Sequence, residues 1–180
     1  SMGKALVAPP PGAFLQATEH GQKVLTDLVR EIVGDSKIIA DLFAGCGTFA
    51  LPLSENAEVF AFESVPDMVK ALDVGWRQTA GLKRLVSEVR DLFKRPLLPD
   101  ELSRFGAVVI DPPRVGAAAQ IAELAQSRVK IIAHVSCNPQ TFARDARVLC
   151  DAGYILDWVQ PLDQFRWSSH VELVGAFRLA

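Results

Sequence analysis

Cysteine is scarce in this sequence: three residues, Cys46, Cys137 and Cys150, occur among 180. Their scattered positions match neither a disulfide framework nor a zinc-binding spacing, which favours a reducing compartment and indicates no metal site. No apolar run reaches the roughly eighteen residues that a membrane-spanning helix needs, and the chain does not open with the basic-then-apolar pattern of a signal peptide. We therefore expect a soluble, cytoplasmic protein without a membrane partner.

An excess of basic charge is also absent, because 19 lysines and arginines stand against 21 aspartates and glutamates. A domain that grips a nucleic-acid backbone by itself is normally basic, so any such partner must be held mostly elsewhere. Repeats are missing too, and 49% hydrophobic side chains suit one compact domain. The opening Ser1–Gly3 resembles the scar of a cleaved expression tag, which leaves residues 4–180 as a single domain and a possible fragment.

Strands and helices alternate along the chain. Apolar runs predict strands at 36–43, 58–63, 85–90, 107–110, 131–136, 154–159 and 171–179. Helical spacing and helix-start signals predict helices at 18–33, from about 49, at 65–80, at 121–126 and from 139 to about 153. The last two strands can pair as an antiparallel hairpin. This alternation predicts an α/β fold with an open, mostly parallel sheet whose ligands bind beyond the carboxyl ends of the strands.

Chemically notable residues end these predicted strands, namely Gly45, Glu63, Asp91, Asp111 and Cys137. Gly45, Gly47 and Ala50 fit a G-x-G-x-x-[GA] turn, and an acid ending the next strand can bind both hydroxyls of a ribose. That spacing alone does not identify the cofactor. Four acids, Asp41, Glu63, Asp91 and Asp111, form a rim at this edge. Such a rim repels a pyrophosphate and suits a sulfonium cation such as that of S-adenosylmethionine.

Cys137 lies on a predicted strand-to-helix turn, where the positive end of a helix favours the thiolate that attacks electrophiles. A cysteine without such neighbours is more often a small buried hydrophobe, and we expect Cys46 and Cys150 to be packing residues. Glu172 stands in an otherwise apolar predicted strand. If it is buried, desolvation raises the pKa of its carboxyl, as a general base requires; if not, it is an exposed edge-strand glutamate.

These motifs resemble the RNA uracil-C5 methyltransferases from about Pro11 to the C-terminus. The nucleophile motif of that family is similar to Ser136-Cys137-Asn138-Pro139 with Thr141, Arg144 and Asp145, and its other motifs are similar to Asp111–Gly116, Asp41–Phe49, Phe14 with Gln16, and His170–Glu172. The chain departs from the family at Thr18, where asparagine is usual, and in the Phe165–Ser169 segment that precedes His170. An RNA-binding barrel and a central domain, which most members carry, have no counterpart here.

The resemblance implies a Rossmann-like class I S-adenosylmethionine-dependent methyltransferase fold, with a seven-stranded, mostly parallel sheet and an antiparallel C-terminal strand. It implies Cys137 as the nucleophile that adds to C6 of a uracil and Glu172 as the base. The implied substrate is ribosomal or transfer RNA. We expect the protein to be a monomer. The residues implied to contact the cofactor are Gln16, Phe43, Gly45, Gly47, Thr48, Glu63, Asp91 and Asp111, and the candidates for substrate binding are Arg114, Asn138, Phe165 and His170.

Three other functions stay open at this point. Asp111-Pro112-Pro113 is also similar to the acid-Pro-Pro-aromatic motif of amino-group methyltransferases, although Arg114 replaces the aromatic residue and those enzymes need no cysteine. A nicotinamide-dependent dehydrogenase would use the same glycine turn, but the acidic rim argues against it because acids repel the pyrophosphate of its cofactor. A non-catalytic module that binds a cofactor or associates with RNA would need neither Cys137 nor Glu172.

Overall fold

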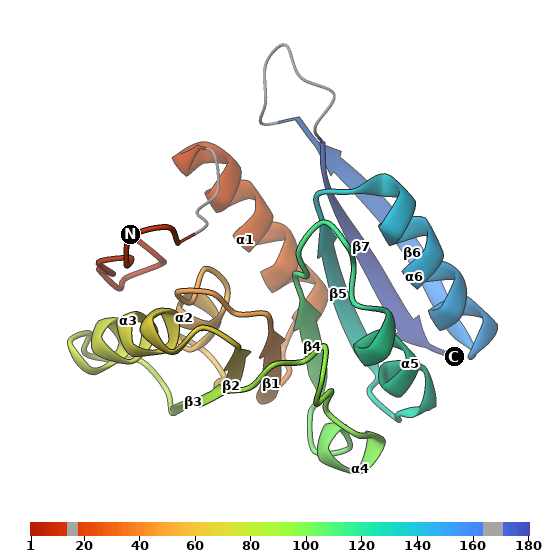
Figure 1. Cartoon of the computed structure of the whole chain (residues 1–180), viewed down its shortest axis with the longest axis horizontal. Coiled ribbons are helices and arrows are strands. Elements are labelled where there is room, and N and C mark those ends of the chain that lie inside the picture. The colour runs from red at the N-terminus through yellow and green to blue at the C-terminus, as the bar shows by residue number, and fades with distance from the viewer. Residues whose placement is uncertain (14–17, 164–170) are drawn as a thin grey trace.

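A sheet with the strand order β3-β2-β1-β4-β5-β7-β6 is the centre of the molecule (Figure 1). The computed structural model describes residues 1–13, 18–163 and 171–180. Within these ranges the strands are β1 Ile38–Leu42, β2 Glu58–Glu63, β3 Leu85–Val89, β4 Ala107–Ile110, β5 Ile131–Ser136, β6 Tyr154–Leu162 and β7 Glu172–Leu179. The helices are α1 Glu19–Val33, α2 Ala50–Leu53, α3 Pro66–Arg77, α4 Pro99–Leu102, α5 Ala118–Gln126 and α6 Pro139–Asp151.

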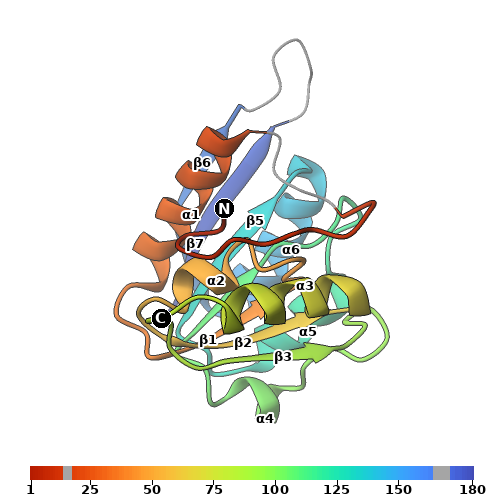
Figure 2. The same ribbon diagram turned by 90° about the vertical axis from the view of Figure 1, so that its left-hand side faces the viewer.

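Each face of the sheet has its own core, because successive strand residues point to opposite sides. Ile39 and Val109 pack with α1, α2 and α3 on one face, whereas Ala40 and Val108 pack with α4, α5 and α6 on the other. Figures 1 and 2 show this three-layer arrangement from two directions. The near-continuous apolar runs of β1, β4 and β5 follow from burial on both faces.

The sheet combines parallel and antiparallel pairs. β1, β2, β3, β4 and β5 pair in parallel, and the order of connection reverses between β1 and β4. β7 inserts between β5 and β6 and is antiparallel to both. The predicted mostly parallel sheet with an antiparallel last strand is therefore confirmed, and the hairpin of the last two strands is confirmed as β6 and β7. The switch point between β1 and β4 is where ligands of such sheets bind.

Local sequence signals explain most of the element ends. The hydroxyl of Thr18 accepts a hydrogen bond from the backbone N–H of Gly21 at 2.9 Å, so it caps α1 as predicted. Gly34 ends the same helix with a positive φ of 52°. The sequence pattern predicts only a proline-punctuated link where α4 lies, but Pro99 begins this short helix at the position where proline costs least.

The chain start differs from the prediction. The sequence places residues 1–3 outside the fold, but Met2 is only 4% exposed and packs in the same core as α1. The segment then passes α3 (Figure 2). At Gly75 of this helix, an added Cβ would lie 2.8 Å from the Val7 side chain, so glycine leaves room for Val7. Across the described ranges, no helix combines the length and apolar character that crossing a bilayer demands.

Candidate functional site

The carboxyl edge of the parallel strands collects the residues that the sequence analysis singled out. Glu63 is the last residue of β2, Asp111 follows β4 directly and Cys137 follows β5 directly. Asp91 lies two residues beyond β3, and Gly45 lies three residues beyond β1. Parallel strands end at one edge, so the structure brings these five residues to the same side of the sheet.

The turn after β1 has a backbone that few residues can adopt. Phe43, Gly45 and Gly47 have positive φ values of 63°, 56° and 95°. At Gly47 a Cβ would lie 2.9 Å from Leu51 and 3.1 Å from Leu72, so only glycine fits between the turn and the helices beneath it. At Gly45, in contrast, a Cβ would meet nothing within 4 Å, so the main chain there is open, as the approach of a nucleotide requires. Thr48 in the same turn is half-buried.

Glu63 connects this turn to the end of β2. Its Oε2 accepts a hydrogen bond from the N–H of Gly45 at 3.0 Å. Its Oε1 accepts hydrogen bonds from the N–H of Ser64 at 2.7 Å and from the N–H of Val65 at 3.0 Å. The carboxylate is consequently held at a fixed position next to the glycine turn.

Asp91 and two aromatic rings border the other side of the turn. Burial works against ionisation of Asp91, but hydrogen bonds from Lys94 and from the N–H of Phe93 outweigh it and lower the pKa of its carboxyl. The rings of Phe43 and Phe93 lie 5.3 Å apart, centroid to centroid. Phe93 is not among the predicted site residues, although an aromatic side chain two residues after a strand-end acid was a usable signal; the residue is 47% exposed.

Cys137 and Glu172 lie at adjoining ends of β5 and β7. In the antiparallel pairing of these strands, Ser136 is opposite Leu173. Cys137 follows Ser136 and Glu172 precedes Leu173, so both residues lie just beyond this pair, and the charge of Glu172 acts on the Cys137 thiol. Cys137 is half-buried and Glu172 is 2% exposed. Burial raises the pKa of the Glu172 carboxyl, as predicted for a buried glutamate in an apolar strand.

The thiol of Cys137 does not behave as predicted. Burial, the charge of Glu172 and the charge of Asp111 raise its pKa, and they outweigh a backbone hydrogen bond and the opposite charge of Arg114. The prediction that the helix N-terminus leaves a net preference for the thiolate is therefore wrong for the protein by itself. Two carboxyl groups close to the sulfur contribute to the difference, because like charges oppose a second anion.

Two further acids border the same edge at different depths. Burial of its carboxyl and the charge of Glu172 raise the pKa of Asp111 to about 7, although part of the residue is accessible to solvent. Asp41 is fully buried within β1, neither of its carboxyl oxygens has a hydrogen-bond partner among the described residues, and burial together with Asp111 raises its pKa well above the usual range. The predicted rim of four acids is thus wrong for Asp41, which lies inside the sheet.

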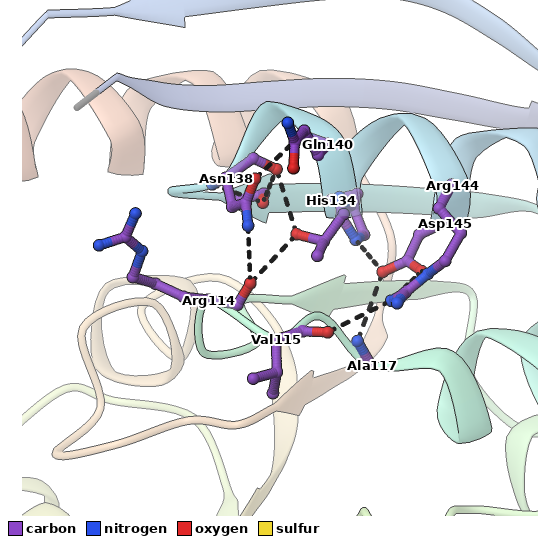
Figure 3. A network of polar contacts seen from close by, with 10 residues as sticks. Arg114, Val115, Ala117, His134, Asn138, Gln140, Arg144 and Asp145 are labelled. Carbon is purple, nitrogen blue, oxygen red and sulfur yellow. Dashed lines mark hydrogen bonds and ion pairs between the residues drawn. The ribbon is translucent and has the colours of Figure 1, made fainter. Parts of the chain in front are cut away.

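The loop after β4 is fastened to the start of α6 (Figure 3). The carbonyl of Arg114 accepts hydrogen bonds from Asn138 Nδ2 at 3.0 Å and from Thr141 Oγ1 at 3.4 Å. Asn138 also caps α6 by accepting from the N–H of Gln140 at 3.0 Å. The Asn138 side chain therefore has a structural use besides the predicted substrate contact. The Arg114 side chain is exposed and extends away from these contacts.

The remaining predictions have mixed outcomes. Cys46 is buried, as a packing residue should be, but Cys150 is exposed on α6, so that expectation is wrong. Gln16, Phe165 and His170 lie outside the described residues.

Known proteins match this chain along nearly its whole length. A sequence profile for the family described as tRNA (Uracil-5-)-methyltransferase matches residues 10–177. An uncharacterized RNA methyltransferase of Rhizobium meliloti (strain 1021) is 55% identical over 169 residues, 94% of this chain and 41% of that protein. The 23S rRNA (uracil(1939)-C(5))-methyltransferase RlmD of Shewanella sp. (strain MR-4) is 32% identical over 176 residues, 94% of this chain and 38% of that protein. The chain spans about two fifths of the length of these relatives.

Solved structures share the fold. The Pyrococcus abyssi tRNA (uracil-54, C5)-methyltransferase in complex with S-adenosyl-L-homocysteine superposes with a TM-score of 0.80 at 30% identity, over 93% of this chain and 40% of that one. Magnesium protoporphyrin IX methyltransferase (ChlM) of Synechocystis PCC 6803 has a TM-score of 0.69 at 16% identity, over 94% and 86% of the two chains. At that identity the second likeness concerns the fold alone.

Proposed function

The chain belongs to the tRNA (uracil-5-)-methyltransferase family, and from this membership we propose that it methylates C5 of a uridine in ribosomal or transfer RNA with S-adenosylmethionine as the methyl donor. Its sheet has the class I S-adenosylmethionine-dependent methyltransferase fold. One observation carries the proposal: Cys137, which follows β5, lies near Glu172 at the start of β7 and near Asp111 after β4, at the carboxyl edge of the sheet.

The residues at the edge fit S-adenosylmethionine. The glycine turn offers open main-chain surface at Gly45, and the fixed carboxylate of Glu63 is positioned for a ribose. Asp91 remains ionised, and the exposed ring of Phe93 offers an apolar surface for an adenine. When bound, the sulfonium supplies an electrophilic methyl group. Of the other proposed cofactor contacts, Gln16 lies outside the described residues, while Phe43 and Thr48 belong to the glycine turn.

Cysteine is needed because C5 of uracil is a poor nucleophile. In the proposed reaction the Cys137 thiol first loses its proton to solvent. The thiolate then forms a bond to C6, and the electron pair of the C5–C6 double bond moves so that C5 becomes enolate-like and takes the methyl group, whose bond to the donor sulfur breaks. Glu172 then takes the proton from C5. The electron pair of that C–H bond restores the double bond as the C6–S bond breaks and returns the thiolate. The buried carboxyl of Glu172 suits this step, because burial raises its pKa above the ordinary value and so makes it a stronger base.

The uracil has to leave its stack to reach this pair, as in other enzymes that act on a base. Arg114 extends from a loop whose backbone is fastened to α6, so its exposed guanidinium is placed to contact a phosphate of the target nucleotide. Most of the RNA has to be held outside this chain, whose net charge is −2. We propose that residues 4–180 form the catalytic domain, with Met2 packed in its core, and that its substrate is ribosomal or transfer RNA.

A covalent adduct tests the proposal. The protein is incubated with S-adenosylmethionine and RNA containing 5-fluorouridine, whose C5 fluorine cannot be removed as a proton, and the mixture is examined by mass spectrometry under denaturing conditions. We expect a protein–RNA adduct that contains the transferred methyl group. Cys137→Ala should abolish it, whereas the matched variant Cys150→Ala, at an exposed position on the following helix, should retain it. Methylation of an exocyclic amino group, independent of Cys137, would instead support the amino-group alternative.

A further inference from the structure

A buried carboxylate in α6 has no role in the chemistry described above. Asp145 is 1% exposed. Its Oδ1 accepts two hydrogen bonds from Arg144, from Nε at 2.9 Å and from Nη2 at 2.7 Å. Its Oδ2 accepts from the N–H of Ala117 at 3.4 Å and lies 3.7 Å from Nε2 of His134 (Figure 3). A charge at such a depth normally requires several partners, and Asp145 has them from three segments of the chain.

Two of those partners, His134 and Ala117, belong to the segments that carry Cys137 and Asp111. His134 lies in β5, three residues before Cys137. Ala117 and Val115 belong to the loop that begins at Asp111, and the carbonyl of Val115 accepts a hydrogen bond from Arg144 Nη2 at 3.4 Å. Asp145 and its neighbour Arg144 therefore connect the segment that presents the nucleophile to the segment that presents Asp111 (Figure 3).

The loop and α6 fit so closely that a side chain is excluded between them. Gly116 has a positive φ of 76°, and a Cβ there would meet Arg144 Nη2, Thr141 Cβ and Asp145 Oδ2. On the opposite side, the His134 ring packs against Phe142, with the ring centroids 5.0 Å apart. A displacement of Asp145 consequently moves the loop backbone or the strand, because the interior is close-packed.

Asp145 stays ionised in this environment. Burial acts to raise its pKa, but the polar contacts with His134, Arg144 and the N–H of Ala117 outweigh burial, so the pKa of the carboxyl is lowered. The network thus keeps a fixed negative charge that accepts hydrogen bonds from Arg144 and from the N–H of Ala117. Nε2 of His134 lies 3.7 Å away and has no hydrogen-bond partner among the described residues. A buried charge held by several donors makes rigid contacts, which is the property that a support for reacting groups needs.

We propose that Asp145 is a positioning residue: through His134, Arg144 and the N–H of Ala117 it fixes where Cys137 stands relative to Asp111, and so where the uracil ring meets the sulfur. The inference rests on the proposed function, since it concerns the same site. The physical reason is that a small displacement of a reacting group slows the reaction strongly: a shift of ~1 Å can lower the rate about a hundredfold.

Asp145→Asn tests the idea with little change of shape. The amide oxygen can still accept from Arg144, but the amide NH₂ then faces the N–H of Ala117, so two donors oppose each other and the link to the loop is lost. We expect the rate of adduct formation with 5-fluorouridine RNA to fall by about tenfold or more. The dissociation constant for S-adenosylhomocysteine should stay within about twofold, because all the described cofactor contacts except Asp111 lie in or after β1, β2 or β3, outside the Asp145 network.

Matched variants on the same helix separate positioning from general stability. Asp151→Asn removes an exposed carboxylate that pairs with Arg147 one turn away, and it should leave both measurements unchanged. If Asp145→Asn folds poorly, Arg144→Gln breaks the same link from a half-exposed side chain, with Arg147→Gln as its control. We expect Arg144→Gln to slow adduct formation severalfold at an unchanged affinity for S-adenosylhomocysteine.

The outcomes are distinguishable. Wild-type adduct rates in Asp145→Asn, or in Arg144→Gln where the first variant does not fold, would overturn the inference. Parallel losses of adduct rate, cofactor affinity and melting temperature would also overturn it, since they indicate a merely structural role. A wild-type protein that binds S-adenosylhomocysteine but forms no Cys137 adduct with RNA would instead remove the proposed function, and the inference with it.

Discussion

At Cys137 the sulfur has two acidic neighbours that oppose its ionisation, and Arg114 is the charged side chain that acts in the opposite direction. Removing one negative charge should therefore make the thiol more acidic. We predict that Glu172→Gln lowers the pKa of the Cys137 thiol, so that alkylation of this residue by iodoacetamide at about pH 8 becomes severalfold faster. Mass spectrometry of the Cys137 peptide measures the rate, and the exposed Cys150 serves as an internal reference. An unchanged rate would mean that the Glu172 charge does not reach the sulfur.

Asp111 should make stability depend on pH. The pKa of its carboxyl is about 7 in the folded protein against an ordinary value of 3.8, so between these values the native state holds a proton that the unfolded state has lost. Stability then falls as pH rises from about 4 to about 7. We predict that Asp111→Asn gains free energy of unfolding relative to wild type across this window, by at least about 1 kcal/mol, and keeps the gain at higher pH. Urea titrations at about pH 4, 5.5, 7 and 8 measure it; a constant difference would contradict the assigned pKa.

Among the elements, α1 offers a local test of its start. The Thr18 hydroxyl accepts the hydrogen bond from Gly21, and an alanine leaves that N–H without a side-chain partner. We predict that Thr18→Ala lowers the free energy of unfolding by about 1 kcal/mol, which chemical denaturation measures. Thr18→Ser keeps the acceptor and should lose much less. Equal losses in the two variants would attribute the effect to the methyl group and not to the cap.

Element types were predictable where the sequence pattern is strong. The bounds of β2 and β4 agree with the prediction, because continuous apolar runs bordered by polar residues define them. α2 has only four residues and α4 was not predicted, since neither contains enough residues to display a helical period. The predicted strand at 36–43 ends earlier, at Leu42, because Phe43 already has the positive φ of the turn.

At the scale of the whole molecule, the sequence indicated which residues lie at the sheet edge but not how they interact. The proximity of Cys137 and Glu172 depends on β7 inserting antiparallel beside β5, a register set by packing between segments that are distant in the chain. The raised pKa of the thiol and the burial of Asp41 follow from the same packing. The partners of Asp145 likewise come from separate segments, which no spacing in the sequence reveals.

The acid-bearing edge as a whole should prefer a cation. Asp111, whose pKa is about 7, is largely protonated in mildly acidic solution, and a sulfonium near it favours the ionised form, so S-adenosylmethionine should bind more tightly as pH rises from about 6 to about 8. S-adenosylhomocysteine lacks the sulfonium charge but carries the same amino-acid group. Ionisation of that group changes both dissociation constants alike, so it does not affect their ratio. We predict that the ratio of the dissociation constant of S-adenosylhomocysteine to that of S-adenosylmethionine increases by at least about twofold across this range. Calorimetric titrations at three pH values in this range give the ratio, and Asp111→Asn should make it independent of pH. A ratio that stays flat in the wild type would show that Asp111 does not sense the methyl donor.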